Sequence, residues 1–225
     1  MSIRRTKGSL QVETQVFAKN GRKVVLCGVM HIAEPSFWGY VNELVKGAEA
    51  RGHEIQYEGV KNDMGRIVHL GPNIGPIAEA VGLQGQHDGL KYGTDWVCSD
   101  IKLTELLQGV STEKLAKVEA DSVETSKTFK DILAGPEGKS AAKFVRWVLG
   151  YVHILSKFPS GTFGIRRSVI LGRRNASAYE AIKSTPKNVT TIWGAAHLPG
   201  IGKMLRADGY KLSGSTWVTV VGPTA

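Results

Sequence analysis

The sequence predicts an α/β fold: a largely parallel sheet of βαβ units with an antiparallel edge and an inserted helical lobe. Three consecutive patterns predict this class. Residues 24–30 are continuously apolar, which is typical of a strand covered on both faces. Apolar residues then recur at helical spacing over residues 37–48, with Gly52 as the predicted stop, and residues 53–58 form a second strand pattern. This order predicts a βαβ unit with parallel strands and a right-handed crossover.

The antiparallel edge is predicted from the first strand pattern of the chain. Residues 10–16 alternate between apolar and polar side chains, with Thr14 at an inward position, and the chain then reaches Asn20 and Gly21. Alternation at period two indicates a half-buried strand, and Asn-Gly is a strong signal for a tight hairpin turn. Residues 217–221 predict the closing strand.

The middle of the chain predicts loops followed by helices. Residues 59–93 are rich in Gly, Asn, Asp and Pro, so we expect loops around a short helix at residues 77–81. Residues 96–98 predict a short strand. The pattern is then helical, and we predict a helical insertion at about residues 104–160 that could cover the site as a lid or lobe.

The last part of the chain alternates between helix and strand again. We predict a helix at residues 168–183, a β-branched strand at 188–193 and a short helix at 201–207. No repeat of 20–50 residues interrupts this order. The 225 residues suit one compact domain, so we predict a single domain over residues 1–225.

Composition limits the class of protein. Hydrophobic residues make up 42% and charged residues 22% of the chain, which are ordinary globular values and exclude disorder as the main state. No apolar run approaches the roughly 20 residues that cross a bilayer. The basic first residues lack a following apolar segment, so we expect neither a signal peptide nor a membrane partner. Two cysteines form no disulfide framework, which predicts a reducing, cytoplasmic setting.

The net charge of +9 raises the question of an anionic partner. The basic residues are scattered along the chain, and the one dense group comprises Arg166, Arg167, Arg173 and Arg174. No recognised nucleic-acid-binding motif accompanies them. An anionic small molecule explains these arginines as well as a nucleic acid does, so we expect a small-molecule or peptide substrate rather than nucleic acid. The oligomeric state is not predicted.

Two Gly-x-x-His motifs are the main functional signal. Gly28 and His31 follow one apolar strand pattern, and Gly194 and His197 follow another; a proline comes soon after each histidine. Ligands of open α/β sheets bind beyond the carboxyl ends of the strands, and a glycine at a strand exit permits a sharp turn. A single motif of this kind carries no weight, because most histidines after strands are structural. The matched contexts predict that both histidines line one site.

Glu58 is the predicted third member of the site. It ends the strand that follows the first βα unit, so the same sheet edge brings it beside His31. Two imidazoles and a carboxylate suit a divalent metal such as Zn, Mn or Co. A glutamate flanked by histidines can equally act on water as a general base without a metal. The sequence leaves both forms open.

The assembled motifs resemble the TraB/Tiki superfamily, which also includes erythromycin-esterase and ChaN-like proteins. The resemblance consists of four blocks in order from about residue 22 to the C-terminus. They are Gly28-Val-Met-His31 with Pro35, Tyr57-Glu58, Arg174-Asn175, and Gly194-Ala-Ala-His-Leu-Pro-Gly-Ile201 with Gly209-Tyr210. The family implies an α/β fold with a hydrolytic site at the carboxyl edge of the sheet, which is metal-dependent in Tiki-like members.

The resemblance also implies roles for individual residues. Glu58 would be a general base or metal ligand, and His31 and His197 would be metal ligands or water-orienting groups. Arg174 would stabilise developing negative charge, with Arg173 as its close rival and Asn175 beside it. Both arginines lie on the predicted helix at residues 168–183. The alternative interpretation is that they are solvent-exposed residues on the surface of that helix.

Other titratable residues are of secondary interest. Asp100 follows a predicted strand and is expected either to orient a histidine or to cap the next segment. His69 and His87 lie in the glycine-rich loops and could approach the site. We expect His153 to be structural on an apolar helix face, and Cys27 to be a core residue rather than a nucleophile.

Three functions follow from these signals. The leading hypothesis is a hydrolase, metal-dependent in its first form, that cleaves a peptide, amide or ester bond with activated water. The alternative is a ChaN-like protein that binds haem, metal or an anionic small molecule without turnover. The third is a basic protein associated with nucleic acid.

Overall fold

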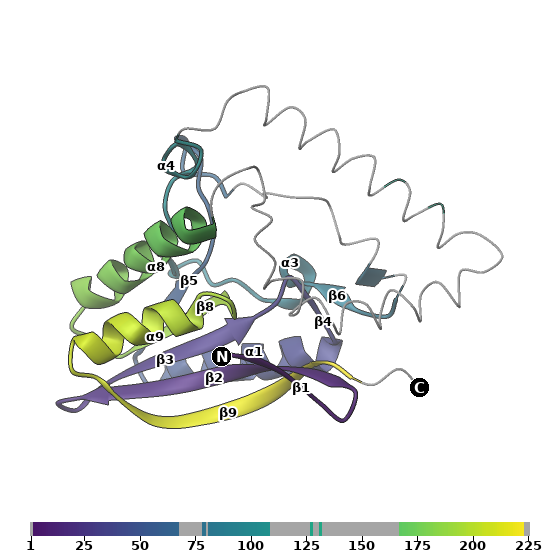
Figure 1. Cartoon of the computed structure of the whole chain (residues 1–225), viewed down its shortest axis with the longest axis horizontal. Helices are drawn as coiled ribbons and strands as arrows, with labels where there is room; N and C mark the ends of the chain where they lie inside the picture. The colour runs from purple at the N-terminus through teal and green to yellow at the C-terminus, as the bar shows by residue number, and fades with distance from the viewer. Residues whose placement is uncertain are drawn as a thin grey trace.

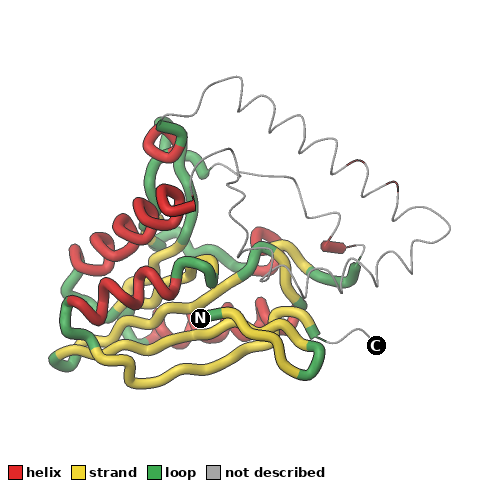
Figure 2. The backbone as a smooth tube through the Cα atoms, in the orientation of Figure 1, coloured by secondary structure: helices red, strands yellow, loops and turns green. Residues whose placement is uncertain are grey.

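The computed structural model describes residues 2–67, 78–79, 81–108, 127, 131 and 167–222. Within these residues, a seven-stranded sheet has the strand order β1-β2-β3-β8-β5-β7, and β9 pairs with the other edge of β2. The fold class is therefore α/β, as the sequence predicts. Figures 1 and 2 show the sheet as one layer with helices on both faces.

The parallel half of the sheet carries the strand ends that matter for the site. It consists of β3 (Arg22–Val29), β8 (Val189–Gly194), β5 (Glu54–Tyr57) and β7 (Val97–Cys98). Every neighbouring pair among these four strands is parallel. β3 and β5 are thus parallel, as predicted, but β8 lies between them. A strand from the end of the chain therefore fills the gap within the predicted βαβ unit.

The antiparallel half forms the predicted edge. β2 (Ser9–Lys19) pairs with β3 through a turn at Asn20 and Gly21, whose φ angles of 49° and 80° are those a primed two-residue hairpin requires. β9 (Lys211–Val221) pairs along the other edge of β2 and begins earlier than the predicted strand at 217–221. The sequence prediction missed β1 (Ile3–Thr6).

Two short strands form a second, antiparallel sheet beside the main one. β4 (Ile32–Ala33) pairs with β6 (Gln84–Gly85). β6 leads directly into the short helix α3 (Gln86–Gly89). The sequence prediction missed both strands, because two residues carry no periodicity.

Helices pack on both faces of the sheet. α1 (Pro35–Ala50) covers one face, and Gly52, with a φ of 73°, ends it as predicted. α8 (Arg167–Ser184) and α9 (Leu198–Ala207) lie side by side on the other face (Figure 1). Each face has its own apolar cluster, one around α1 and one around α8 and α9. The described helices include none that is long and apolar enough to cross a bilayer.

Much of the predicted helical insertion lies outside the described residues. Of residues 104–160, the structure describes 104–108, 127 and 131; α4 (Leu103–Leu106) lies at the start. His153 and Arg166 also lie outside the described residues, as does His69. In the predicted helix at 77–81, Ala78 and Glu79 are helical.

Candidate functional site

The carboxyl ends of the four parallel strands meet at one edge of the sheet. Val29 of β3 pairs with Gly194 of β8, and Tyr57 of β5 pairs with Ile192 of β8 and Cys98 of β7. The residues that follow these strands are therefore neighbours. α8 crosses above this edge and supplies Arg174 and Asn175 from one face of the sheet.

Glu58 lies at the centre of the resulting group of side chains. Its Oε1 accepts a hydrogen bond of 2.6 Å from Arg174 Nη2, and its Oε2 accepts one of 2.5 Å from the backbone N–H of Gly194. His197 Nε2 lies 3.7 Å from Oε1. A Cβ at position 194 would lie 2.9 Å from Oε2, so the approach of this carboxylate requires glycine.

His197 is buried and oriented by its neighbours. It is 4% exposed, and its Nδ1 lies 2.7 Å from Asn175 Oδ1. The Trp193 ring packs edge-on against the imidazole with 5.1 Å between centroids. A Cβ at Gly200 would lie 2.0 Å from the Asn175 amide nitrogen, so glycine at this position of α9 makes room for the residue that holds His197.

Arg174 is shared between two carboxylates. Its Nε donates to Asp100 Oδ1 at 2.9 Å and its Nη2 to Asp100 Oδ2 at 2.5 Å, in addition to the bond to Glu58. The Asp100 side chain is fully buried. Asp100 therefore holds Arg174 rather than a histidine, and the N-cap residue of α4 is Lys102. Arg174 also lies over the Trp193 ring, 5.6 Å from its centroid.

The surroundings shift the pKa values of the two central groups. Burial raises the pKa of Glu58, but Arg174, His197, the Gly194 N–H and His31 together lower it below the usual value. Burial is the largest influence on His197 and lowers its pKa, against the opposing effect of Glu58. At neutral pH, Glu58 is therefore a carboxylate and His197 a neutral imidazole.

The other predicted residues lie around this group rather than within it. His31 is exposed, and no side-chain contact joins it to the group among the described residues, although its charge acts on the pKa of both Glu58 and His197. Gly28 of β3 packs between β2 and α9, where a Cβ would lie 2.7 Å from the Glu13 carbonyl oxygen and 3.1 Å from Leu198. The histidines thus share an edge of the sheet without contact.

Arg173 points away from Glu58. It is exposed, and its Nη1 donates to the Glu105 carbonyl at 3.3 Å and to Gln108 Oε1 at 3.0 Å. Arg174, rather than its rival, contacts Glu58. His87 is exposed and stacks on Tyr92 with 6.2 Å between centroids, outside the group. Cys27 is buried in the core, and burial raises the pKa of its thiol to about 11.

Three supporting residues, Trp193, Ser99 and Ser177, were not anticipated from the sequence. Trp193 forms the floor beneath both His197 and Arg174, and its Nε1 donates to Ser99 Oγ at 3.0 Å. Ser177 of α8 in turn donates to the Ser99 carbonyl at 3.0 Å. The sequence signal was the position of Trp193 directly before Gly194; a strand tryptophan is ordinarily interpreted as core.

The described side chains do not fit a metal site with three protein ligands. No group of three or more His, Cys, Asp or Glu residues in the described parts of the chain is arranged to hold a metal ion. His197 Nε2 and Glu58 Oε1 are two neighbouring atoms that could bind a metal, but catalytic zinc sites use three protein ligands. The Arg174 cation, 2.6 Å from Oε1, also opposes a metal ion there.

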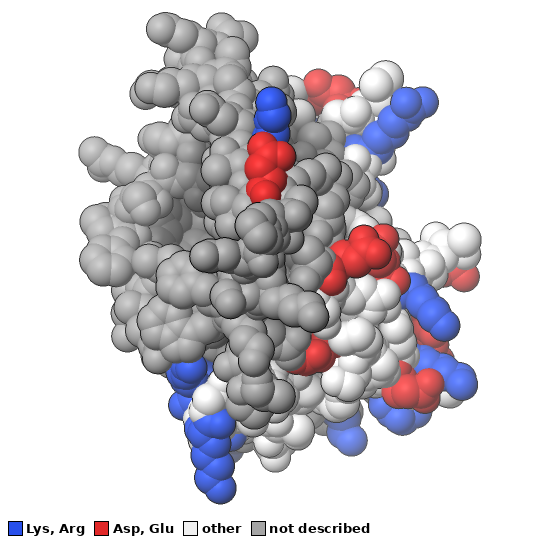
Figure 3. Space-filling model, turned by 90° about the vertical axis from the view of Figure 1, so that its right-hand side faces the viewer, with Lys and Arg blue, Asp and Glu red and all other residues white. Residues whose placement is uncertain are grey.

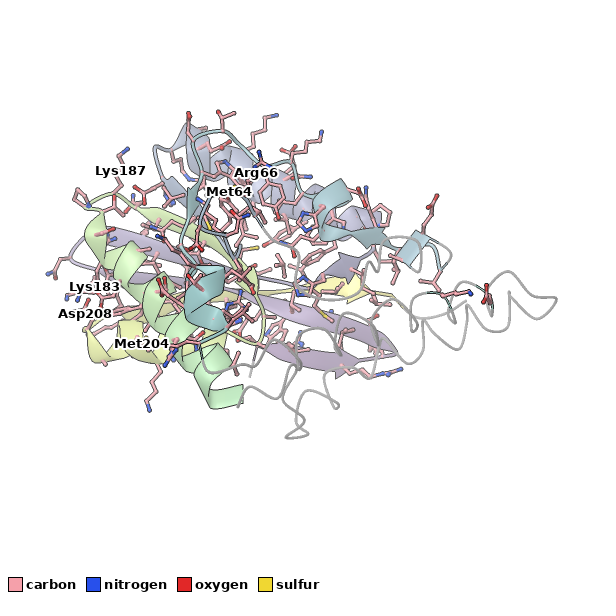
Figure 4. The ribbon with its side chains drawn as sticks, turned by 90° about the horizontal axis from the view of Figure 1, so that it is seen from above. Met64, Arg66, Lys183, Lys187, Met204 and Asp208 are labelled. Atoms are coloured by element: carbon pink, nitrogen blue, oxygen red, sulfur yellow. The ribbon has the colours of Figure 1, made fainter. Side chains whose placement is uncertain are left out.

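Among the described residues, charge and shape away from Glu58 show no second group of this kind. Figure 3 shows Lys and Arg side chains mostly at the margins of one face, with Asp and Glu between them. A hollow of about 330 Å³ lies at the amino ends of the parallel strands, lined by Lys19, Arg22, Lys183, Asp208 and Tyr210 among others. Lys183 and Asp208, labelled in Figure 4, mark that end. It is opposite to Glu58.

Comparisons of the chain with protein-family models, curated proteins and solved structures found no match. The resemblance to the TraB/Tiki superfamily therefore stays a prediction from the motifs.

Proposed function

We propose that this protein is a hydrolase that cleaves a peptide, amide or ester bond with a water molecule activated between His197 and Glu58. The observation that carries the proposal is the orientation of the His197 ring. Asn175 Oδ1 can only accept a hydrogen bond, so the His197 Nδ1 beside it carries the ring proton. The unprotonated Nε2 then faces the Glu58 carboxylate oxygen at 3.7 Å.

Two acceptors at this distance are suited to share a donor. A water molecule can donate one hydrogen bond to Nε2 and one to Oε1, which holds its oxygen ready for attack. His197 is the better base, because the pKa of Glu58 is lowered below its usual value. In this arrangement His197 takes the proton from water. Glu58 orients the water and stabilises the imidazolium that forms.

Arg174 has a double role in the proposal. It keeps Glu58 ionised, and Asp100 fixes the plane of its guanidinium by two hydrogen bonds. Its Nη1 takes no part in these contacts and is the group we assign to the oxyanion that develops on the carbonyl oxygen. Arg174, Glu58 and Asp100 together carry a net charge of −1, which favours a neutral group over an anion beside Glu58.

A hydrolase that needs a metal ion is a second form of the same proposal, and the chelation test described below distinguishes it from the metal-free form. Since the described donor atoms do not fit a three-ligand site, we derive no step through Zn, Mn or Co. The ChaN-like alternative requires a histidine that can meet a haem or metal without turnover. His197 is 4% exposed with its Nε2 turned to Glu58, which favours the hydrolase.

The test is a panel of fluorogenic peptides, amides and esters assayed with the full chain before and after chelation. Loss of activity in His197→Gln and Glu58→Gln, with activity kept in Arg173→Gln, supports the proposal, because Arg173 neighbours Arg174 but faces α4. Activity that persists after chelation supports the metal-free form. Equal activity in wild type and His197→Gln, or none in any substrate class, overturns the assignment.

A further inference from the structure

Ser99 is bonded to residues on both sides of the candidate site. It directly follows β7 and is 3% exposed. Its backbone N–H and its Oγ both donate to the Tyr57 carbonyl, at 3.1 and 3.3 Å. Its Oγ also accepts the hydrogen bond of 3.0 Å from Trp193 Nε1. Because its proton is used on Tyr57 and a lone pair on Trp193, the hydroxyl has one fixed direction.

The bond to Ser99 determines the orientation of the Trp193 ring. An indole has one polar group, its Nε1–H, which can only donate. Trp193 is 0% exposed, so solvent cannot replace Ser99 as the acceptor. A rotation of the ring about its Cβ–Cγ bond would turn Nε1 away from Ser99 and leave a buried donor unpaired, which is unfavourable. Ser99 therefore selects one orientation of the ring.

Two residues of the candidate site contact the ring that Ser99 fixes. The His197 imidazole lies against it at an interplanar angle of 69°, with 5.1 Å between centroids. The Arg174 guanidinium carbon lies over it, 5.6 Å from its centroid. A rotated Trp193 ring would displace both neighbours. In particular, the distance of 3.7 Å from His197 Nε2 to Glu58 Oε1 depends on where the imidazole lies.

The residue after Ser99 holds the other half of the site. Asp100 binds Arg174 Nε and Nη2, and Arg174 in turn binds Glu58. Ser177, one turn after Arg174 in α8, donates to the Ser99 carbonyl at 3.0 Å. These bonds do not involve the Ser99 hydroxyl. Its effect can therefore be measured apart from that of Asp100.

We infer that Ser99 is a positioning residue of the candidate site, which fixes the position of the His197 imidazole through the Trp193 ring. Its role in catalysis rests on the proposed hydrolase function, whereas its effect on the imidazole requires no turnover. Ser99 touches no reacting group in the proposed reaction. Loss of its hydroxyl should therefore lower kcat, because the base is misplaced, and leave KM nearly unchanged.

The test compares Ser99→Ala with wild type in the full chain, by NMR and by kinetics. The His197 Hδ2 and Hε1 resonances report the position of the indole directly, because an aromatic ring shifts the resonances of protons beside it. We expect both resonances to move in Ser99→Ala and kcat to fall about tenfold, within the loss that a small misplacement causes. KM should change less than about twofold.

Trp193→Phe provides a second, independent measurement. Phenylalanine keeps an aromatic ring but has no N–H for Ser99 to accept. Adding Ser99→Ala to Trp193→Phe should therefore change kcat less than about twofold, whereas two unconnected residues would give the loss of about tenfold again. A full loss in the double variant would contradict the inference.

Thr190→Val is the matched control. Thr190 is 0% exposed in β8, the strand of Trp193, but its hydroxyl lies 3.0 Å from His53 Nδ1 at the other end of that strand. The change removes a buried hydroxyl, as Ser99→Ala does, and should leave the His197 resonances where they are. Unmoved His197 resonances in Ser99→Ala, or an equal shift in Thr190→Val, would rule out the positioning role. If the resonances move only in Ser99→Ala but wild type hydrolyses no substrate class, the hydrolase proposal fails and the positioning role stands.

Discussion

The two Gly-x-x-His motifs are alike in sequence and different in structure. His197 is buried, with its imidazole beside Asn175, Trp193 and Glu58. His31 is exposed, and its backbone carbonyl rather than its ring is engaged, by Gln86. One motif thus positions an imidazole for chemistry, while the other positions a piece of backbone.

The residues after each motif explain the difference. Helix α9 starts directly after His197, and the backbone turn Gly194–His197 directs the imidazole under α8. After His31 the chain continues as β4, which pairs with β6. The histidine falls between two strands and faces solvent. A glycine at a strand exit therefore permits a functional turn, but a helix packed above it has to supply the partners.

The largest test of this comparison is to replace each histidine in turn. His197→Gln should lower kcat/KM by about 10²–10⁴, which is the usual contribution of a general base. His31→Gln should lower it by less than about tenfold, because His31 acts on Glu58 and His197 only through its charge. Assays on both variants, with circular dichroism as a folding control, decide this. Equal losses would show that the motifs are equivalent.

The second test compares the two neighbouring arginines through their partners. Asp100→Asn removes a buried charge from Arg174 and should lower the free energy of unfolding by about 1.5–3 kcal/mol, the range for hydrogen bonds to charged groups. Arg173→Gln should change it by less than about 0.5 kcal/mol, because Arg173 is exposed. Urea denaturation measures both. Similar values would contradict a structural role of Asp100 beneath the site.

Sequence periodicity predicted the elements that are long enough to show it. The strand pattern at residues 24–30, the helix at 37–48 and the hairpin at Asn20 and Gly21 are confirmed. Residues 10–16 alternate in polarity, but the strand is not half-buried as predicted: Glu13 and Gln15 are buried as well as Thr14, so both faces are covered in the middle of β2. The order of strands could not be read, since the placement of β8 between β3 and β5 depends on long-range packing.

Part of the site could be predicted because strand exits in a parallel sheet share one edge. That rule placed Glu58, His197 and Asp100 together. It could not tell which partner each would take: Asp100 binds Arg174, and nothing in the local sequence fixes the rotation of α8 that decides this. His31 was predicted at the centre on the same rule, but the two-residue strand β4 turns it outward.

The third test addresses Gly200, which follows His197 in the second motif and has no counterpart after His31. Gly200→Ala brings a Cβ to 2.0 Å from the Asn175 amide, so Asn175 must move and His197 loses its support. We expect a loss of about 1–3 kcal/mol in the free energy of unfolding, as for an overpacked core. Activity should fall with it.

Gly172→Ala is the matched control in α8, where nothing lies within 4 Å of the added Cβ. It should stabilise the protein by up to about 1 kcal/mol through helix propensity. If both variants behave alike, the contact between Gly200 and Asn175 does not support His197.

The smallest expected effect is on the titration of His197. Burial lowers its pKa below the usual value for histidine of about 6.5, so in the folded protein the imidazole stays neutral at pH values where the unfolded chain has begun to bind a proton. Because the unfolded state then binds more protons, stability falls as the pH drops from about 6.5 toward the folded pKa. For the same reason the base form persists to lower pH than in a free histidine.

NMR titration of the His197 ring protons in native and urea-unfolded protein measures this, and Asn175→Asp should raise the native midpoint by adding a charge beside Nδ1–H. A native midpoint at or above the unfolded one would mean that His197 is held as an imidazolium by Glu58. It would then be an acid rather than the base that distinguishes it from His31.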